Sequence, residues 1–386
     1  MDLLAPLSEL LHLGWVPVLM AAAGVGMGLL IGAMPGLNQG VLMALTLPLT
    51  MTMSDLNAQC LLIGMYVGGA SGAMVMGVLI GVPGSPSAIM TTFDGHAMAR
   101  KGQAARALAL GVSAAFLGGL VSWLVLATLA IPLSSIALLF TPVEFTSLIF
   151  GGLLIIAVAG DHDPLKGLMA GFLGMLAAIV GLDPVTSNAR FIFGFLPLQS
   201  GFGLLPVLLG TFAIGQLLAN ITADNPVADQ ARVRFVDTLR SVRAVGRHWL
   251  IVLRSGLIGC WMGMHPGVGA SIGSIIAYMV TRNLADDPKS FGTGREEGVV
   301  ASEAGSVGTI GGALLPMISL GIPGSPADVI LMAALVFHNI QPGPMLIVEH
   351  PTVFYGIIVT LFVSLVLMFV LLLPLCTVLG RVAALP

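Results

Sequence analysis

The stretch "GVPGSPSAIM" at residues 81–90 returns as "GIPGSPADVI" at residues 321–330. Each copy places two prolines and two glycines in a nearly uncharged, apolar region of the chain. These residues release backbone N–H and C=O groups from the helical ladder, and each orphaned group is costly in hydrocarbon. The two stretches therefore predict interrupted helices at membrane depth, where a polar partner has to meet the released groups.

The composition of the chain is that of a membrane protein. Of the 386 residues, 57% are hydrophobic and 9% are charged, whereas a soluble domain has about 25% charged residues. Apolar runs of about 17–25 residues recur along the chain, which is the length of a membrane-crossing helix. We predict an all-α integral membrane protein, a polytopic helical bundle with two inverted repeats that contain Pro-Gly-broken or re-entrant helices. The first residues lack the basic region of a signal peptide, so we expect the first apolar segment to be retained.

Several other classes of site are not indicated. The three cysteines, Cys60, Cys260 and Cys376, are far apart and have no C-x-x-C spacing, which argues against a zinc site or a disulfide framework. The string "DHDPLK" at 161–166 reads better as a turn than as a metal cluster. No phosphate loop or basic aromatic patch indicates nucleotide hydrolysis or nucleic-acid binding. We expect no cofactor beyond a coupling Na⁺ or H⁺.

The chain contains an internal repeat. "GAMPGLNQG" at 32–40 resembles "GMHPGVGAS" at 263–271, and each block precedes one of the P-G-S-P motifs. The first pair of blocks is 231 positions apart and the second pair is 240 apart, so the second copy has nine more residues between its motifs. The predicted units are a first repeat at 1–106, connecting spans with a cytoplasmic Arg-rich loop at 107–246, and a second repeat with a final span at 247–386.

The basic residues indicate that the two repeats are inverted. In the first copy the loop between the motifs, at 54–59, has no Lys or Arg, and the basic loop at 94–106 follows the second motif. In the second copy the charged loop at 282–298 lies between the motifs, and the later loop at 337–350 has no Lys or Arg. Basic loops stay in the cytoplasm, so the copies face opposite ways. Parallel repeats are the main alternative.

The connecting region is expected to hold four spans, near 107–130, 135–158, 165–182 and 201–221, which return the chain to the same side. Arg190 is the exception to this topology. The basic residues expected on the cytoplasmic side are Arg100, Lys101, Arg106, Lys166, Arg232, Arg234, Arg240, Arg243, Arg247, Arg282, Lys289, Arg295 and Arg381.

The interrupted helices are the candidate substrate site. Paired broken helices in corresponding halves are the best sequence indication of a transporter's binding site. A helix that restarts after a proline offers free N–H groups and the positive end of its dipole, which suits a carboxylate. The predicted substrate-binding residues are Pro35, Gly36, Asn38, Pro83, Gly84, Ser85, Ser87, Pro266, Gly267, Ser271, Pro323, Gly324 and Ser325.

A second set of groups suits a cation. Carbonyl groups at the end of the preceding half-helix favour an ion such as Na⁺, and an ionisable side chain within a span is a functional candidate by default. For Asp328 the alternative is N-capping of the restarted helix. Asp94 is expected to cap or order its own loop, and His265 is left open between substrate contact and a place at the membrane interface. The cation-coupling candidates are Gly81, Val82, Gly321, Ile322, Asp328 and Glu303.

The motifs together resemble the large membrane subunit of the tripartite tricarboxylate transporter family. The resemblance covers most of the chain and rests on "MPGLNQGVLMALTLPLT", on the string from P-G-S-P through "DGHAMARKGQA", and on the region from "HPGVGAS" to "GIPGSPADVI". It implies a multi-pass protein of the bacterial inner membrane that imports di- or tricarboxylates, or related organic anions, by cation symport. It also implies two partners, a periplasmic solute-binding protein and a small four-helix-type membrane subunit.

The chain departs from the family pattern in places. It reads "YVGGASGAM" where the family has Y-G-G-x-Y-G-G-S, and Gly305, Ser306 and Val307 stand where the family has asparagines. We expect Ser306 and Thr309 to replace those asparagines, or the substrate to differ. The family also continues with further C-terminal spans, whereas this chain ends at Pro386, which indicates a short subfamily or a missing segment.

Two other functions fit parts of the sequence. "GASG" at 69–72 matches the G-x-S-G pattern of an intramembrane serine protease, with Ser71 as nucleophile and His265 or His338 as base. A passive channel or a non-transporting scaffold subunit would need no paired cation sites. We favour a transporter over an enzyme.

Overall fold

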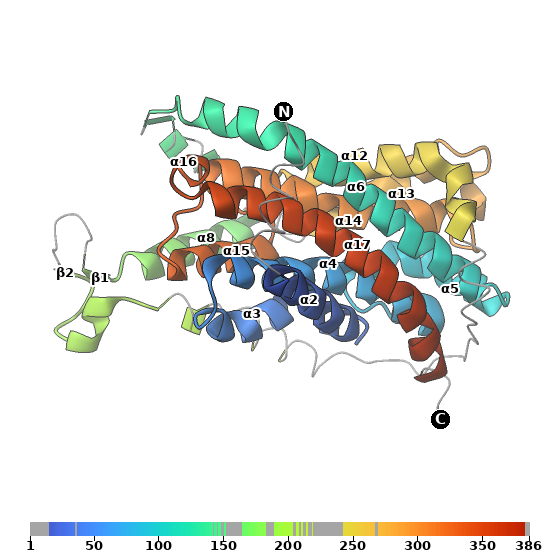
Figure 1. Cartoon of the computed structure of the whole chain (residues 1–386), viewed down its shortest axis with the longest axis horizontal. Helices are drawn as coiled ribbons and strands as arrows, with labels where there is room; N and C mark the ends of the chain where they lie inside the picture. The colour runs from blue at the N-terminus through green and yellow to red at the C-terminus, as the bar shows by residue number, and fades with distance from the viewer. Residues whose placement is uncertain are drawn as a thin grey trace.

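The computed structural model describes residues 15–34, 37–141, 164–182, 189–203, 242–266 and 269–382, together with some isolated positions between 143 and 218. It is a bundle of helices, and the short β1–β2 pair (Gly181–Leu182 and Ala189–Arg190) is its strand content in these residues (Figure 1). The predicted all-α membrane fold is confirmed.

The elements follow one another in three groups. The first half contains α2 (Val16–Gly32), α3 (Gln39–Thr50), α4 (Asp55–Ile80), η1 (Pro86–Ala88), α5 (Ile89–Arg100) and α6 (Ala104–Ala137). The middle contains α8 (Pro164–Ala178) and η2 (Leu196–Ser200) besides the two strands. The second half contains η4 (Val242–His248), α12 (Trp249–Gly263), α13 (Gly269–Asn283), η5 (Pro288–Ser290), α14 (Glu296–Leu320), α15 (Pro326–Phe337), α16 (Leu346–Glu349) and α17 (Pro351–Val382).

Four of these helices, α4, α6, α14 and α17, are long and apolar enough to cross a membrane. The shortest of them, α14, has 25 residues and is therefore about 37 Å long, more than the roughly 30 Å of a hydrocarbon core. Buried residues run along nearly the whole length of α4 and α14, while α6 and α17 expose one side. The spanning helices thus form an inner pair, α4 and α14, flanked by an outer pair.

Glycines bring the helices of each half into close contact. Each contact between α2 and α4 has an equivalent contact between α12 and α14. Equivalent residues of α2 and α12 are 231 positions apart in the sequence, and those of α4 and α14 are 240 apart, as in the sequence motifs. In the first half the contacts are Gly28 with Met65, Gly32 with Gly69, and Leu29 with Gly72. Their counterparts in the second half, in the same order, are Gly259 with Gly305, Gly263 with Thr309, and Cys260 with Gly312. In each pair a glycine meets the backbone of the other helix, where a side chain would collide with a carbonyl oxygen. The two halves therefore share one packing pattern.

The two inner helices run in opposite directions. Val78, near the end of α4, and Val299, near the start of α14, lie on either side of Gly95. The outer helices are exchanged between the halves, since α6 packs mainly on α14, whereas α17 packs mainly on α4 and also contacts α6 and α2. This arrangement agrees with the inversion that the basic loops predict.

The P-G-S-P motifs form chain reversals after a complete span. Of the two predicted forms, a broken span and a re-entrant segment, the broken span is wrong, because α4 runs unbroken to Ile80. The chain then folds back, so that the Gly84 N–H donates to the Ala73 carbonyl at 3.0 Å, and α5 runs beside the second half of α4. Gly81 and Gly321 start the two reversals with φ of +74° and +71°, a left-handed conformation that glycine adopts freely. The reversal, not a cut span, is what brings a helix N-terminus to mid-depth.

The earlier pair of motifs lies at the tips of two helical hairpins. α2 and α12 run parallel to α4 and α14 and end beside the reversals, because Gly32 contacts Gly84 and Gly263 contacts Gly324. α3 and α13 then return toward the end from which α2 and α12 came, and each leads into a spanning helix. Each hairpin thus reaches about half the depth of the bundle. Pro35, Gly36 and Gly267 in the tips lie outside the described residues.

One end of the bundle gathers the basic loops. Arg106 pairs with Glu296 at 2.5 Å, His248 approaches the same carboxylate at 3.3 Å, and Lys101 Nζ donates to the Thr293 carbonyl at 2.6 Å. These contacts join the α5–α6 turn, η4 and the α13–α14 loop, which were all predicted to be cytoplasmic. We call this region the charged end and the region around Thr50 and His338 the opposite end.

The connecting region is only partly described. α6 covers the predicted span at 107–130 but continues to Ala137 with Pro132 inside the helix, so the predicted boundary near 130–135 is wrong. Buried side chains of α6 lie both before and after Pro132 in the sequence. Their packing inside the bundle keeps the helix continuous through the proline. α8 covers most of the predicted span at 165–182. Residues 152–158, most of 201–221, and Arg232, Arg234 and Arg240 lie outside the described residues.

We predict that Gly28→Ala destabilises the protein by about 1–3 kcal/mol, because the added Cβ would lie 2.6 Å from the Met65 oxygen and 2.7 Å from the Gly69 nitrogen. Gly26→Ala, on the same helix but facing open space, is the control and should be neutral or stabilising. Unfolding of the purified protein in mixed detergent–SDS micelles measures both. Equal stability of the two variants would contradict the close-packing role of Gly28.

Candidate substrate-binding site

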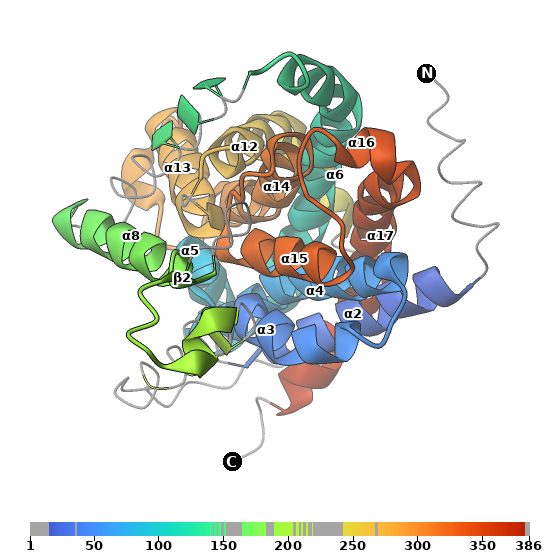
Figure 2. The same ribbon diagram turned by 90° about the vertical axis from the view of Figure 1, so that its left-hand side faces the viewer.

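Four helix N-termini open onto one cavity in the middle of the bundle. α3, α13, α15 and the η1–α5 segment each contribute their first residues to its wall, and the cavity has a volume of about 270 Å³. Figure 2 looks along the bundle and shows α3, α5, α13 and α15 around its middle. The lining residues of this central cavity are Asn38, Gln39, Gly40, Tyr66, Ser85, Pro86, Ser87, Gly269, Ala270, Ser271, Ser325, Pro326 and Ala327.

Each of the four N-termini follows one of the repeated proline-glycine motifs. Asn38 caps α3, since its Oδ1 accepts a hydrogen bond from the Val41 N–H at 3.1 Å, and Ser325 begins α15 in the same way. Ser85 and Ser325 have nearly identical backbone angles, φ −146° and −145°, ψ 163° and 166°. The first-turn N–H groups of a helix have no partner within the helix, so the N–H groups that these caps leave free, together with the positive ends of the helix dipoles, face the cavity.

Seven of the thirteen lining residues have polar side chains, and none of the thirteen is charged. Ser85 and Ser87 share a hydrogen bond at 2.8 Å, and Tyr66 and Ser325 share one at 2.9 Å that joins α4 to the second reversal. The buried Oε1 of Gln39 has no hydrogen-bond partner. Among the described residues, no Lys, Arg or His lines the cavity. Its positive potential therefore comes from the ends of helices.

The structure brings together one part of the predicted substrate set. Asn38, Ser85, Ser87, Ser271 and Ser325 all line the central cavity. The other described members, Pro83, Gly84, Pro266, Pro323 and Gly324, lie outside the lining and shape the turns behind it. Gly84 and Gly324 lie against the Gly32 and Gly263 carbonyls, so larger residues there would disturb helix packing. Such variants are therefore a poorer test of binding than variants of the serines.

Tyr66 is a lining residue that the repeat pattern did not indicate. It sits in the middle of α4, is buried, and reaches Ser325 of the other half. A lone tyrosine in an apolar span is a usable signal, because a buried phenol oxygen needs a partner.

The predicted cation carbonyls are not at the central cavity. Gly81 lies beside the His96 ring, and Gly321 and Ile322 line a different cavity of about 560 Å³ together with Gln341 and Pro342. Val82, next to Gly81, is likewise absent from the central lining. The reason is the length of α4 and α14: because both helices are complete spans, their carbonyl ends lie at the ends of the bundle.

Two buried carboxylates lie closer to the site. Asp328 stands in the first turn of α15, and both of its oxygens are buried without a hydrogen-bond partner; they lie near the backbone of Gly324 and Ser325 but outside hydrogen-bonding geometry. Its own N–H bonds to Ser325, so the arrangement is an incomplete capping box. Glu303 accepts from Thr91 Oγ1 at 2.5 Å, and its Oε2 has no partner.

The remaining candidates have other partners. His265 Nδ1 lies 2.8 Å from the Trp261 carbonyl, and His338 Nε2 lies 3.2 Å from the Thr50 carbonyl. The Ser71 hydroxyl is buried without a hydrogen-bond partner, so no described histidine is placed as its base. The geometry of a serine protease is therefore absent from the described residues. Asp94, expected to order its own loop, bonds instead to the loop before α14.

Comparison with known proteins agrees with this architecture. Residues 18–386 match the tripartite tricarboxylate transporter TctA family. The chain is 33% identical over 377 residues to an uncharacterized 52.8 kDa protein in the TAR-I ttuC' 3' region of Agrobacterium vitis, covering 97% of this chain and 75% of that protein. It is 34% identical over 117 residues to an uncharacterized protein in the TAR-II ttuC' 3' region of the same organism, covering 30% of this chain and 48% of that protein. No solved structure matches the chain. This multi-pass membrane protein belongs to the tripartite tricarboxylate transporter TctA family, whose members are the large subunits of tripartite transporters.

Proposed function

We propose that this chain carries di- or tricarboxylates, or related organic anions, across the bacterial inner membrane by cation symport, and that the central cavity holds the substrate. The observation that supports this most directly is the convergence of four helix N-termini on one polar cavity. Each terminus is equivalent to roughly +0.5 elementary charge, so the four together supply on the order of +2. That potential suits an anion with two or three carboxylates.

The size of the cavity supports a small substrate. A volume of about 270 Å³ lies just below the range of roughly 300–1,000 Å³ typical of small-molecule pockets. The hydroxyls of Ser85, Ser87, Ser271 and Ser325 add donors beside the backbone N–H groups. A compact organic anion can thus be held by hydrogen bonds from several directions without a basic side chain.

The position of the cavity between the repeats supports alternating access. Its walls come from both halves, and the Tyr66–Ser325 bond crosses between them. In transporters with inverted repeats, movement of one part against the other exposes a central site to each side in turn. Family membership implies a soluble binding protein and a small membrane subunit, and we propose that the former docks at the opposite end, near 54–59 and 338–351.

The test is uptake by the reconstituted complex. We expect the chain, together with its small subunit and a binding protein, to accumulate a labelled di- or tricarboxylate in proteoliposomes when a Na⁺ or H⁺ gradient is imposed. Each gradient is tested separately, and a vesicle without a gradient is the control. A folded complex that takes up none of the tested carboxylates under either gradient, with any of the candidate binding proteins, would contradict the proposal.

We predict that Ser85→Ala and Ser325→Ala each weaken substrate binding about five-fold, since a lost hydrogen bond is worth about 1 kcal/mol and 1.4 kcal/mol is a factor of ten. Ser135→Ala on α6 is the control, because its exposed hydroxyl bonds only to the Ile131 carbonyl. Calorimetric titration of the purified protein with the transported anion measures all three. Wild-type affinity in both cavity variants would place the substrate elsewhere.

Asp328 and Glu303 remain the cation-coupling candidates, and Asp328 is nearer to the cavity. We expect Asp328→Asn to lose gradient-driven accumulation while retaining exchange of labelled for unlabelled substrate, because removal of the charge affects the coupling ion more than the anion. Asp286→Asn, an exposed carboxylate in the α13–α14 loop, is the matched control. Undiminished gradient-driven accumulation in Asp328→Asn would remove Asp328 from the coupling site.

A further inference from the structure

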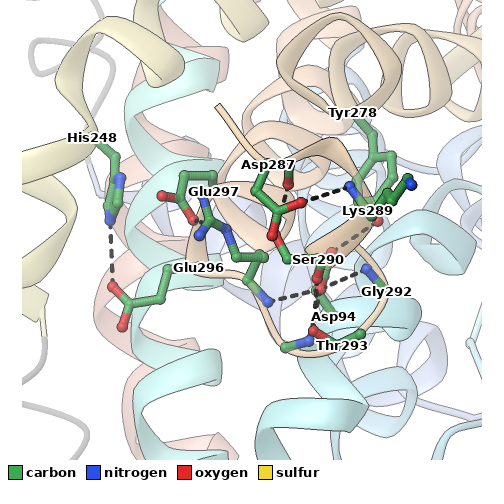
Figure 3. A network of polar contacts seen from close by, with 12 residues as sticks. Asp94, His248, Tyr278, Asp287, Lys289, Ser290, Gly292, Thr293, Glu296 and Glu297 are labelled. Carbon is green, nitrogen blue, oxygen red and sulfur yellow. Dashed lines mark hydrogen bonds and ion pairs between the residues drawn. The ribbon is translucent and has the colours of Figure 1, made fainter. Parts of the chain in front are cut away.

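Asp94 makes an unusual set of contacts at the charged end. This α5 side chain is completely buried, and its carboxylate accepts four hydrogen bonds (Figure 3). Oδ1 accepts from the backbone N–H groups of Gly292 at 2.9 Å, Gly294 at 2.8 Å and Arg295 at 2.7 Å, and Oδ2 accepts from the Tyr278 hydroxyl at 2.8 Å. All four donors belong to the second half of the chain, whereas Asp94 belongs to the first.

The three backbone donors form an anion-binding nest. Gly292 and Gly294 have φ of +86° and +106°, conformations that favour glycine and that turn successive N–H groups toward one point. Gly298 leaves room for the carboxylate, because a Cβ there would collide with Oδ2. Lys101 holds the same loop by bonding to the Thr293 carbonyl, but it does not touch Asp94. The loop is thus built around one carboxylate.

This nest lies in the α13–α14 loop at 284–295, which is eight residues longer than the α3–α4 connection of the first copy. The first copy joins α3 to α4 with only Met51–Ser54, which offers no comparable nest. With the offset of 240, the counterpart of Asp94 on α15 is Ala334, which has no carboxylate. There, α15 is tied to the last residue of α3 by the His338–Thr50 bond at 3.2 Å and to α4 by the bond from Gln59 to the Leu331 carbonyl at 3.3 Å. The two ends of the bundle are therefore held together very differently.

The two helices that Asp94 joins both begin at the central cavity. η1–α5 contributes Ser85 and Ser87 to the lining, and α13 contributes Gly269, Ala270 and Ser271. Both helices then run to the charged end, where Asp94 bonds to Tyr278 of α13 and to the loop that follows α13. Separation of these two helices at the charged end would extend the cavity in that direction, and it would break the Asp94 contacts.

We propose that Asp94 and the Gly292–Arg295 nest form a latch that closes the central cavity toward the charged end. The inference rests on the proposed function in taking this cavity as the transport site. Opening the charged end has to break four hydrogen bonds to a carboxylate, whereas opening the opposite end breaks two contacts of neutral groups, His338 with Thr50 and Gln59 with the Leu331 carbonyl. Asp94 is thus a positioning residue that decides which end of the cavity opens first, and it does not contact the substrate.

The test compares Asp94→Asn with the parent protein in two measurements that need no substrate. The first is hydrogen exchange of the amides at 292–295. The second is labelling of Ala270→Cys, a cavity position, by a membrane-impermeant maleimide applied to one side of the membrane at a time. Cys60, Cys260 and Cys376 are buried, and the protein without Ala270→Cys gives their background. Asp287→Asn, an exposed carboxylate of the same loop that bonds only within it, is the matched control.

We expect Asp94→Asn to speed amide exchange at 292–295 at least ten-fold and to open Ala270→Cys to labelling from the charged end, with Asp287→Asn unchanged. Asparagine keeps an acceptor oxygen for the nest but removes the negative charge, and hydrogen bonds to a charged acceptor are roughly twice as strong as those to a neutral one. Faster exchange without labelling from the charged end would overturn the latch, since Asp94 would then only order the loop. Unchanged exchange would overturn it as well.

A second variant covers a failure of Asp94→Asn to fold. Tyr278→Phe removes one of the four donors and leaves the carboxylate in its nest. We expect a smaller increase in labelling from the charged end, and no increase in a folded Tyr278→Phe protein would overturn the latch. Because neither readout involves transport, failure of the carboxylate uptake assay and failure of the latch are distinguishable results.

Discussion

The structure depends on one constraint: four helices begin at the middle of the bundle, where the N–H groups of a first turn have no partner within their own helix. Ordinary spanning helices hide their ends in water or headgroups, but here four helices begin at half depth, around one cavity. Such ends are tolerated only inside protein or beside a polar space. The reversals, the hairpin tips and the polar side chains of the lining all serve to place and satisfy these termini.

Close packing of glycine makes that placement accurate. The hairpin helices α2 and α12 lie so near to α4 and α14 that backbone meets backbone, and their ends contact the reversals at Gly84 and Gly324. Without a hydrophobic driving force between helices in lipid, contact of this kind is a main source of association. The same contacts occur in both halves with the same offsets, so the four termini reach a common level from two opposite directions.

The sequence predicted much of this arrangement. It did not predict the lengths of α4 and α14, which decide how deep in the bundle the ends of these helices lie. Matching proline-glycine motifs indicated the repeat, and helix-start residues such as Asn38, Ser85 and Ser325 indicated the polar ends that the cavity gathers. The same motifs did not reveal that α4 continues to Ile80, because a Gly-Val-Pro-Gly string looks alike whether it cuts a span or follows one. The carbonyl ends at Gly81 and Gly321 were misplaced for that reason. Tyr66 and the partners of Asp94 depend on contacts between distant segments, which no local pattern encodes.

The absence of basic side chains from the described lining of the cavity has a consequence for how an anion is recognised there. Peptide dipoles and backbone N–H groups do not titrate, so the attraction they exert is the same in acid and in base. A lysine or histidine in their place would make the receptor itself respond to pH. In this cavity, apart from any effect of the neighbouring carboxylates, pH changes the attraction by changing the charge of the substrate. Each proton gained by a bound carboxylate removes one of the charges that the helix ends attract.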